Sequence, residues 1–257
     1  MATTIGFLGG GRIARILITA LVEHSVDPRS IAVSESSDAA RSILLGERPG
    51  LRAASQAEIA AGSDVIFLAL PPAAIGAAIG GGRLIPRPGA VVVSLAPKVA
   101  LRDISSLLGG FDRLVRMIPN APSIVGAGYN PTCFGLALGD ADRSALRALF
   151  SNFGRCPEVE ESKLEGYAVL TAMGPTYFSF QIYELMRIAS GFGLDSGEVA
   201  SATRAMLEGA LATIFDSGLA PERVLDLIPS KPMAADEAAI RAIFEAALPA
   251  TYAKLKS

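Results

Sequence analysis

The feature that most constrains this chain is a glycine-rich turn close to its start, Gly9-Gly10-Gly11-Arg12-Ile13-Ala14. The apolar run Ile5–Leu8 before the turn predicts a buried strand, and apolar residues recur at helical spacing after it. Gly9, Gly11 and Ala14 match the pattern G-x-G-x-x-A, in which small residues allow a tight turn, close approach to a pyrophosphate and packing of helix on strand. Because the first N–H groups of a helix bind anions, the turn predicts a dinucleotide-binding domain.

The organisation of the chain changes once along its length. Up to residue 157, apolar runs alternate with helical patterns, which is typical of a parallel sheet with helices on both faces. The expected strands are Ile5–Leu8, Ser30–Ser34, Asp64–Leu70, Ala90–Leu95, Arg113–Ile118 and Thr132–Leu138. Residues 158–257 carry only helical patterns, rich in apolar and small residues. We therefore predict an α/β fold: a Rossmann-type, doubly wound domain over 1–157, followed by an all-helical domain over 158–257 that assembles as a homodimer or a higher homo-oligomer.

Composition excludes several other classes of protein. The 257 residues have a net charge of −2 without a basic cluster, so no nucleic-acid partner is expected. No apolar run approaches the ~20 residues of a membrane span, and no secretory signal is evident, so a cytoplasmic location is expected. Cys133 and Cys156 lack metal-ligand spacing, and His24 is the single histidine, near a predicted helix end. The sequence therefore predicts no metal site and no Ser-His-Asp triad.

The carboxyl ends of the predicted strands carry the residues expected to bind a cofactor. Glu35 follows the second strand, at the position where an acid binds ribose hydroxyls and repels a 2′-phosphate. This favours NADH over NADPH, although Ser34, Ser36 and Ser37 could hydrogen-bond a phosphate, and Glu35 could be a solvated strand-end acid. The full expected set is Gly9, Gly11, Arg12, Ile13, Ser34, Glu35, Ser36, Leu70, Pro71, Pro72, Pro119 and Asn120.

Three further segments follow the glycine turn in order: Asp64–Pro72, Val115–Pro122 with Gly126 and Gly128, and Thr171–Tyr177. They are similar to the D-V-V-x-L-A-V-K-P, V-R-x-M-P-N-x-P and S-G-S-G-P-A-Y segments of the pyrroline-5-carboxylate reductase family. The chain resembles that family over nearly its full length. The resemblance implies a dinucleotide domain, a helical domain that interlocks in a dimer, and hydride transfer from NAD(P)H to the C=N bond of a cyclic imine in proline biosynthesis. A protonated imine is already electrophilic, so a site without histidine is compatible with this reaction.

The same resemblance assigns the reacting and substrate residues, and it also shows departures. Asn120, Thr171 and Tyr177 are the implied catalytic residues, and Met173, Thr176, Ser230 and Lys231 the implied substrate-binding residues. The family's S-P-G-G-x-T loop falls near 229–235, where this chain has Pro229-Ser230-Lys231-Pro232-Met233-Ala234-Ala235. Pro71 replaces a lysine of the family, and Pro97-Lys98 replaces its A-G. The substrate is therefore expected to be pyrroline-5-carboxylate or a related imine that is bulkier or less acidic.

Three alternatives remain from the sequence. A 3-hydroxyacid dehydrogenase relative would carry a lysine where this chain has Gly166–Leu170, which contains none. A deazaflavin-dependent NADP oxidoreductase would need an arginine-rich phosphate site that the sequence lacks. A non-catalytic nucleotide-binding relative is favoured by the altered 229–235 loop, whereas the intact glycine turn, Pro119-Asn120 and Gly174-Pro175 weigh against it.

Overall fold

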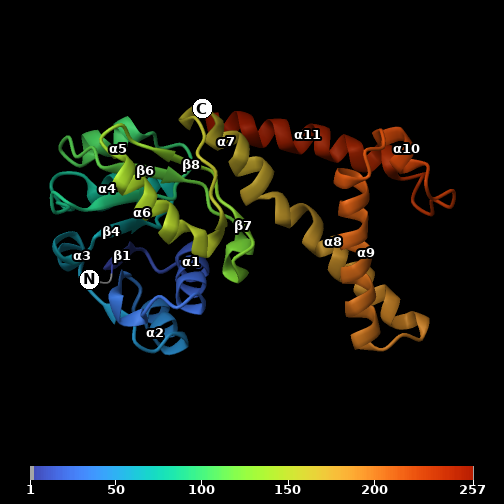
Figure 1. The fold of residues 1–257 in the computed structure, drawn as a ribbon, viewed down its shortest axis with the longest axis horizontal. Helices are drawn as coiled ribbons and strands as arrows, with labels where there is room; N and C mark the ends of the chain where they lie inside the picture. The colour runs from blue at the N-terminus through green and yellow to red at the C-terminus, as the bar shows by residue number, and fades with distance from the viewer. Residues whose placement is uncertain (1–2, 257) are drawn as a thin grey trace. The chain divides into compact units, whose positions relative to one another are not determined.

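The computed structural model describes residues 3–256 and divides the chain into two compact units (Figure 1). One unit comprises the chain up to Met173 together with the residues from Thr251 onward, and the other is Gly174–Ala250. The first unit extends past residue 157 because Leu164 and Ala168 pack on Ile118. The predicted boundary between a dinucleotide-binding domain over 1–157 and a helical domain over 158–257 stays a prediction. Within the described residues, we find no helix with the length and apolar character needed to cross a membrane.

The first unit is built around a seven-stranded sheet with the order β3-β2-β1-β4-β5-β6-β8. The first six of these strands are parallel neighbours, and β8 is antiparallel to β6. The strands are β1 (Ile5–Leu8), β2 (Ile31–Ser34), β3 (Arg52–Ala53), β4 (Val65–Leu68), β5 (Val91–Ser94), β6 (Leu114–Met117) and β8 (Thr132–Phe134). The strand order reverses between β1 and β4, which confirms the predicted doubly wound, Rossmann-type architecture.

Helices connect the strands, and a small second sheet pairs β7 (Gly128–Tyr129) with β9 (Gly154–Arg155). The helices of this unit are α1 (Arg12–Glu23), α2 (Asp38–Glu47), α3 (Gln56–Gly62), α4 (Pro72–Ile79), α5 (Leu101–Leu107), α6 (Asp140–Phe150) and α7 (Leu164–Tyr167). A π-helical turn, Ala168–Ala172, continues α7.

Two details of the sheet differ from the sequence-based expectation. β3 was not predicted, because its two residues are exposed and carry no apolar pattern. The run expected over Thr132–Leu138 forms a strand only to Phe134, and this strand is antiparallel. The connection from β6 contains a short 3-10 turn, Ala121–Val125, instead of the helical crossover that a parallel strand requires.

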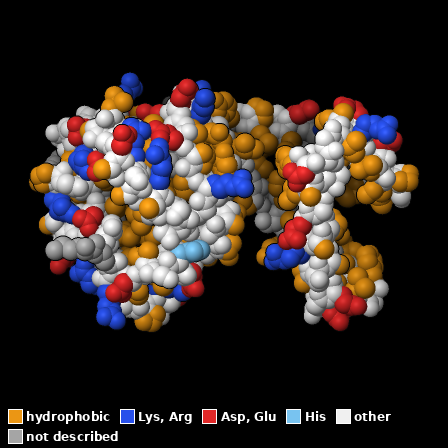
Figure 2. Space-filling view, in the orientation of Figure 1, with side chains coloured by type: hydrophobic (Ala, Val, Ile, Leu, Met, Phe, Trp, Pro, Cys, Tyr) orange, Lys and Arg blue, Asp and Glu red, His pale blue; other side chains and the backbone are white. Residues whose placement is uncertain are grey.

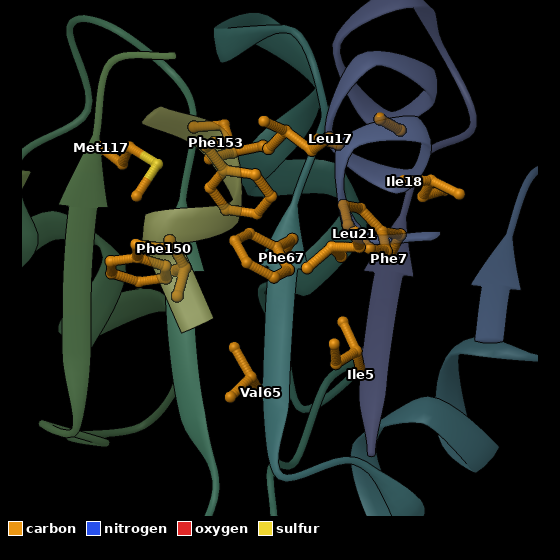
Figure 3. Close-up of a cluster of buried hydrophobic side chains, with 14 of the residues drawn as sticks. Ile5, Phe7, Leu17, Ile18, Leu21, Val65, Phe67, Met117, Phe150 and Phe153 are labelled. Carbon is orange, nitrogen blue, oxygen red and sulfur yellow. The ribbon is translucent and has the colours of Figure 1, made fainter. Parts of the chain in front are cut away.

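The core lies on both faces of the sheet, because every residue of β1, β4 and β5 is buried. On one face Phe7 stacks on Phe67 with ring centroids 4.8 Å apart, and Phe67 meets Phe153 edge-on (Figure 3). Leu17 and Leu21 of α1 are fully buried in the same cluster, as their helical spacing predicts. The other face packs against α3, α4 and α5 through residues such as Ile59, Ile75, Ile79 and Ile104.

The second unit is all-helical, as predicted for this part of the chain. It contains α8 (Gly174–Ala189), α9 (Ser196–Asp216), α10 (Pro221–Leu225) and the greater part of α11 (Glu237–Lys256). Within α8 and α9, only Gly174, Val199 and Thr203 are buried. Large apolar side chains are exposed in this unit, and they include Phe178, Phe180, Tyr183, Phe192 and Phe215. Figure 2 shows hydrophobic side chains on the surface of the helical part of the chain.

Candidate active site

The glycine turn forms an open cradle between β1 and α1. Gly9 has φ +97°, and a Cβ there would lie 2.5 Å from the carbonyl oxygen of Ala69, so only glycine fits this position. Gly11 is different, because a Cβ there would meet no heavy atom of the described residues within 4 Å, apart from its own chain neighbours. Gly11 is also the N-cap of α1 and provides no side-chain cap for the first N–H groups of the helix. Free space beside uncapped helix N–H groups fits a pyrophosphate.

Glu35 lies directly beside this cradle, after β2. Its carboxylate accepts a hydrogen bond from the N–H of Gly10 at 2.7 Å and another from the N–H of Ser37 at 2.8 Å. The bond from Ser37 and, to a lesser degree, that from Gly10 hold the pKa of Glu35 below its usual value despite partial burial. The carboxylate is therefore ionised at neutral pH and positioned at the edge of the cradle, as a ribose-binding acid requires.

The other edge of the cradle comes from the end of β4. Leu70 approaches the turn so closely that a Cβ on Gly9 would lie 3.1 Å from its Cδ2. Pro71 is the N-cap of α4, and Pro72 is its first residue. The structure thus brings together the predicted residues of the β1 and β4 ends at the point where the strand order reverses.

Asn120 follows β6 and is only 7% exposed. Its side-chain oxygen accepts a hydrogen bond from the N–H of Tyr129 at 3.1 Å, and its Nδ2 donates to the carbonyl of Thr171 at 3.2 Å. The backbone N–H of Asn120 donates to Oδ1 of Asn130, which is fully buried. Asn120 therefore links the end of β6 to the π-helical turn, and its predicted catalytic role stays a prediction.

Thr171 and Met173 lie at the end of the first unit. The hydroxyl of Thr171 donates to the carbonyl of Tyr167 at 2.9 Å, so this side chain is bound within its own helix. The ring of Tyr167 lies 6.1 Å from that of Tyr129, which again joins this helix to the segment after β6. The structure brings Thr171 and Asn120 together and leaves Met173 half-buried.

The remaining predicted residues belong to the second unit. Tyr177 packs edge-on against Phe244 of α11, and burial raises the pKa of its hydroxyl. Phe244 also lines a pocket of about 1040 Å³ beside the altered 229–235 loop. Ser230 and Lys231 line the same pocket, together with apolar residues that include Ile228, Pro232, Met233 and Ile240. Thr176 is exposed on α8.

Sequence reasoning missed two groups of residues. Asn130 has its side chain bonded to Asn120, Ser123 and Phe153, but an isolated asparagine carries no pattern that reveals this. Arg116 is buried and forms ion pairs with Glu161 and Glu165. A charged residue inside the apolar run of β6 is a signal that could have indicated this buried cluster.

Comparison with known proteins finds similarity to reductases. Residues 4–98 match the family described as NADP oxidoreductase, coenzyme F420-dependent. Pyrroline-5-carboxylate reductase from Corynebacterium melassecola is 26% identical over 250 residues, which are 96% of this chain and 92% of the relative. The enzyme of the same name from Synechocystis is 28% identical over 222 residues, or 84% and 78% of the two chains. Over most of its length, the chain is therefore similar to pyrroline-5-carboxylate reductases.

The fold is also similar to that of a solved pyrroline carboxylate reductase. The crystal structure of pyrroline carboxylate reductase from Plasmodium falciparum, with NADP bound, superposes with a TM-score of 0.84 at 18% identity and covers 99% of this chain and 97% of its own. The match to the F420-dependent oxidoreductases covers only residues 4–98, whereas similarity to the pyrroline-5-carboxylate reductases continues through the C-terminal helices. The similarity therefore extends over both units of the chain.

Proposed function

We propose that this protein is an NAD(P)H-dependent reductase that transfers hydride to the C=N bond of a cyclic imine, either pyrroline-5-carboxylate, to give proline, or a related imine. The observation that carries the proposal is the open cradle at Gly11, beside uncapped N–H groups of α1 and the ionised Glu35, in a chain similar to pyrroline-5-carboxylate reductases. The cofactor supplies the hydride when it is bound. Gly9, Gly11, Arg12 and Ile13 would hold its pyrophosphate, and Glu35, with Ser34 and Ser36 beside it, would hold a ribose.

We infer a preference for NADH from the carboxylate of Glu35, which would repel a 2′-phosphate. One contact works against this preference, because Arg41 lies close by and donates from Nη1 to the carbonyl of Glu35 at 3.0 Å. The same guanidinium is ion-paired with Asp38, which offsets its charge. We therefore expect NADH to be the better cofactor by a modest factor, and we expect the enzyme to act in the cytoplasm.

The remaining roles follow the family resemblance. Leu70, Pro71 and Pro72 at the end of β4 and Pro119 and Asn120 at the end of β6 would flank the nicotinamide, as strand ends do in this fold. Asn120, Thr171 and Tyr177 are proposed as catalytic residues, and Met173, Thr176, Ser230 and Lys231 as substrate-binding residues. Their task is to orient the imine and exclude water, because a protonated imine needs no strong acid.

The second unit supports assembly into a homodimer or a larger homo-oligomer. Its helices expose many large apolar side chains, and a stable monomer seldom exposes so much apolar surface in one region. Sedimentation at micromolar concentration is expected to give a dimer or larger species. A stable monomer would contradict this part of the proposal.

The test of the reaction is the oxidation of NADH and NADPH with pyrroline-5-carboxylate and with neutral cyclic imines of several ring sizes. Turnover of one or more of these imines is expected, and the Gly11→Val variant is the matched control that should lose it. Tight cofactor binding without turnover of any imine would favour a non-catalytic nucleotide-binding protein instead. The ratio of kcat/KM between the acidic and the neutral imines decides which substrate the altered 229–235 loop serves.

A further inference from the structure

A buried ionic cluster joins three segments of the first unit at the carboxyl side of the sheet. Arg116 of β6 is 2% exposed and donates from Nη1 to Glu161 at 2.9 Å and from Nη2 to Glu165 at 2.7 Å. The same oxygen of Glu165 accepts the backbone N–H of Lys98 at 3.2 Å, and that of Glu161 accepts the N–H of Leu101 at 2.7 Å. The cluster therefore holds the loop between β5 and α5 at two points.

The backbone at Lys98 explains why this loop needs an anchor. Lys98 has φ +72° and is one of two described non-glycine residues with a positive φ, the other being Ser25. Residues with a side chain rarely adopt this region, and such strain persists only where the surroundings enforce it. The family resemblance places glycine at this position, and glycine adopts the same conformation freely. The residue with the strained backbone, Lys98, is itself the donor of the hydrogen bond to Glu165.

The topology places this loop on the nicotinamide side of the proposed cofactor site. Glu35, the proposed ribose-binding acid, follows β2 on one side of the strand-order reversal, and β4, β5 and β6 lie on the other side. A dinucleotide in such a sheet spans the reversal, so its second nucleotide lies over the ends of β4–β6. Burial alone would raise the pKa of Glu165, but the hydrogen bond and charge of Arg116 lower it. The carboxylate of Glu165 is therefore ionised at neutral pH.

We propose that Glu165 is a positioning residue that acts through the N–H of Lys98 to fix the β5–α5 loop on the nicotinamide side of the proposed cofactor site. The expected effect of Glu165 on turnover rests on the proposed function. The hydrogen bond by which Glu165 holds the loop does not depend on any substrate.

The experiment compares Glu165→Ala with Asp142→Ala. The control removes a carboxylate that pairs with Arg113, a residue preceding the opposite end of β6, at 2.8 Å. Glu165→Ala is expected to lower kcat roughly tenfold or more while the Kd for NADH changes less than about twofold, because the nicotinamide end is misplaced and the pyrophosphate cradle is intact. Asp142→Ala should leave both constants near their wild-type values. Equal effects of the two variants on kcat would overturn the proposal.

Two further variants separate positioning from general stability. Lys98→Gly in the Glu165→Ala background should restore most of the lost kcat, because glycine adopts the positive φ without an anchor. Glu165→Gln should retain an intermediate kcat, since its amide oxygen still accepts the N–H of Lys98, and it carries the test if Glu165→Ala fails to fold. A further loss of kcat on adding Lys98→Gly would contradict the proposed role.

Limited trypsin digestion provides a readout that is independent of turnover. Cleavage after Lys98 should accelerate roughly tenfold in Glu165→Ala and stay at the wild-type rate in Asp142→Ala, because only the first variant removes the hydrogen bond that holds Lys98. An unchanged rate of cleavage after Lys98 would contradict the proposal that Glu165 holds the loop, even if kcat fell. If the wild-type protein turns over no imine, the proposed function fails while the trypsin result still decides whether Glu165 holds the loop.

Discussion

Gly11→Val is the substitution for which the structure gives the sharpest prediction. Apart from its chain neighbours, a Cβ at Gly11 would meet no described heavy atom within 4 Å, and Gly11 has φ −69°, which any residue adopts. The change from glycine at an N-cap costs about 0.5–1 kcal/mol, and the reduced freedom of the unfolded chain offsets about as much. We therefore expect the melting temperature to change by less than about 4 °C.

Cofactor binding should respond very differently. The added methyl groups enter the space beside the first N–H groups of α1, where the pyrophosphate is expected to bind. Hydrogen bonds to a charged group contribute about 1.5–3 kcal/mol each, so the loss of two of them predicts a weakening of NADH binding by at least about 100-fold. Fluorescence titration with NADH measures the loss directly.

Thermal unfolding with and without NADH provides the second measurement. Cofactor at 100 times its Kd stabilises the wild-type protein by about 2.7 kcal/mol, and at the same concentration this increment should fall below about 0.5 kcal/mol in the variant. Gly9→Ala is the matched control. Its Cβ would meet a carbonyl oxygen at 2.5 Å on a backbone with φ +97°, so this variant should lose stability even without cofactor. An unchanged NADH Kd in Gly11→Val would refute the assignment of the cradle.

Three other predictions follow from the first unit. Glu35→Ala combined with Ser36→Arg should shift cofactor preference towards NADPH, and a wild-type protein that already prefers NADPH by about tenfold, or 1.4 kcal/mol, would contradict the role of Glu35. Phe67→Ala should lower the free energy of unfolding by about 3–5 kcal/mol, because Phe67 is fully buried between Phe7 and Phe153. Leu136 is fully exposed, so the control variant Leu136→Ala should change the free energy of unfolding by less than about 0.5 kcal/mol. Asp64 is partly buried, which raises its pKa, but hydrogen bonds from Thr4 and the charge of Arg87 bring the pKa below its usual value. The stabilising contribution of Asp64 is therefore complete above the unfolded-state pKa and lost as the pH falls below about 4. In urea titrations, the free energies of unfolding of wild type and Asp64→Asn should differ at pH 7 and converge in acid.

The sequence by itself determined the features that depend on local patterns. The glycine turn between an apolar strand and an amphipathic helix predicted the dinucleotide cradle, because turn geometry and helix N–H groups are set by residues adjacent in the chain. Alternating strands and helices up to residue 157 predicted the doubly wound sheet, and the absence of strand patterns after it predicted the helical unit. The position of Glu35 at the end of a strand was likewise readable from the spacing alone.

Only the tertiary structure decided the contacts between segments far apart in the chain. The side chain of Asn120 is bonded to Tyr129 and Thr171, and no spacing rule encodes those partners. Arg116 meets Glu165 49 residues away, and this pair in turn holds Lys98 in a conformation that its residue type disfavours. Local propensity describes what one segment prefers by itself, whereas a buried charge or a strained backbone is stable only when distant groups converge on it. The β5–α5 loop is such a place, because its conformation depends on a helix that the chain forms some 60 residues later.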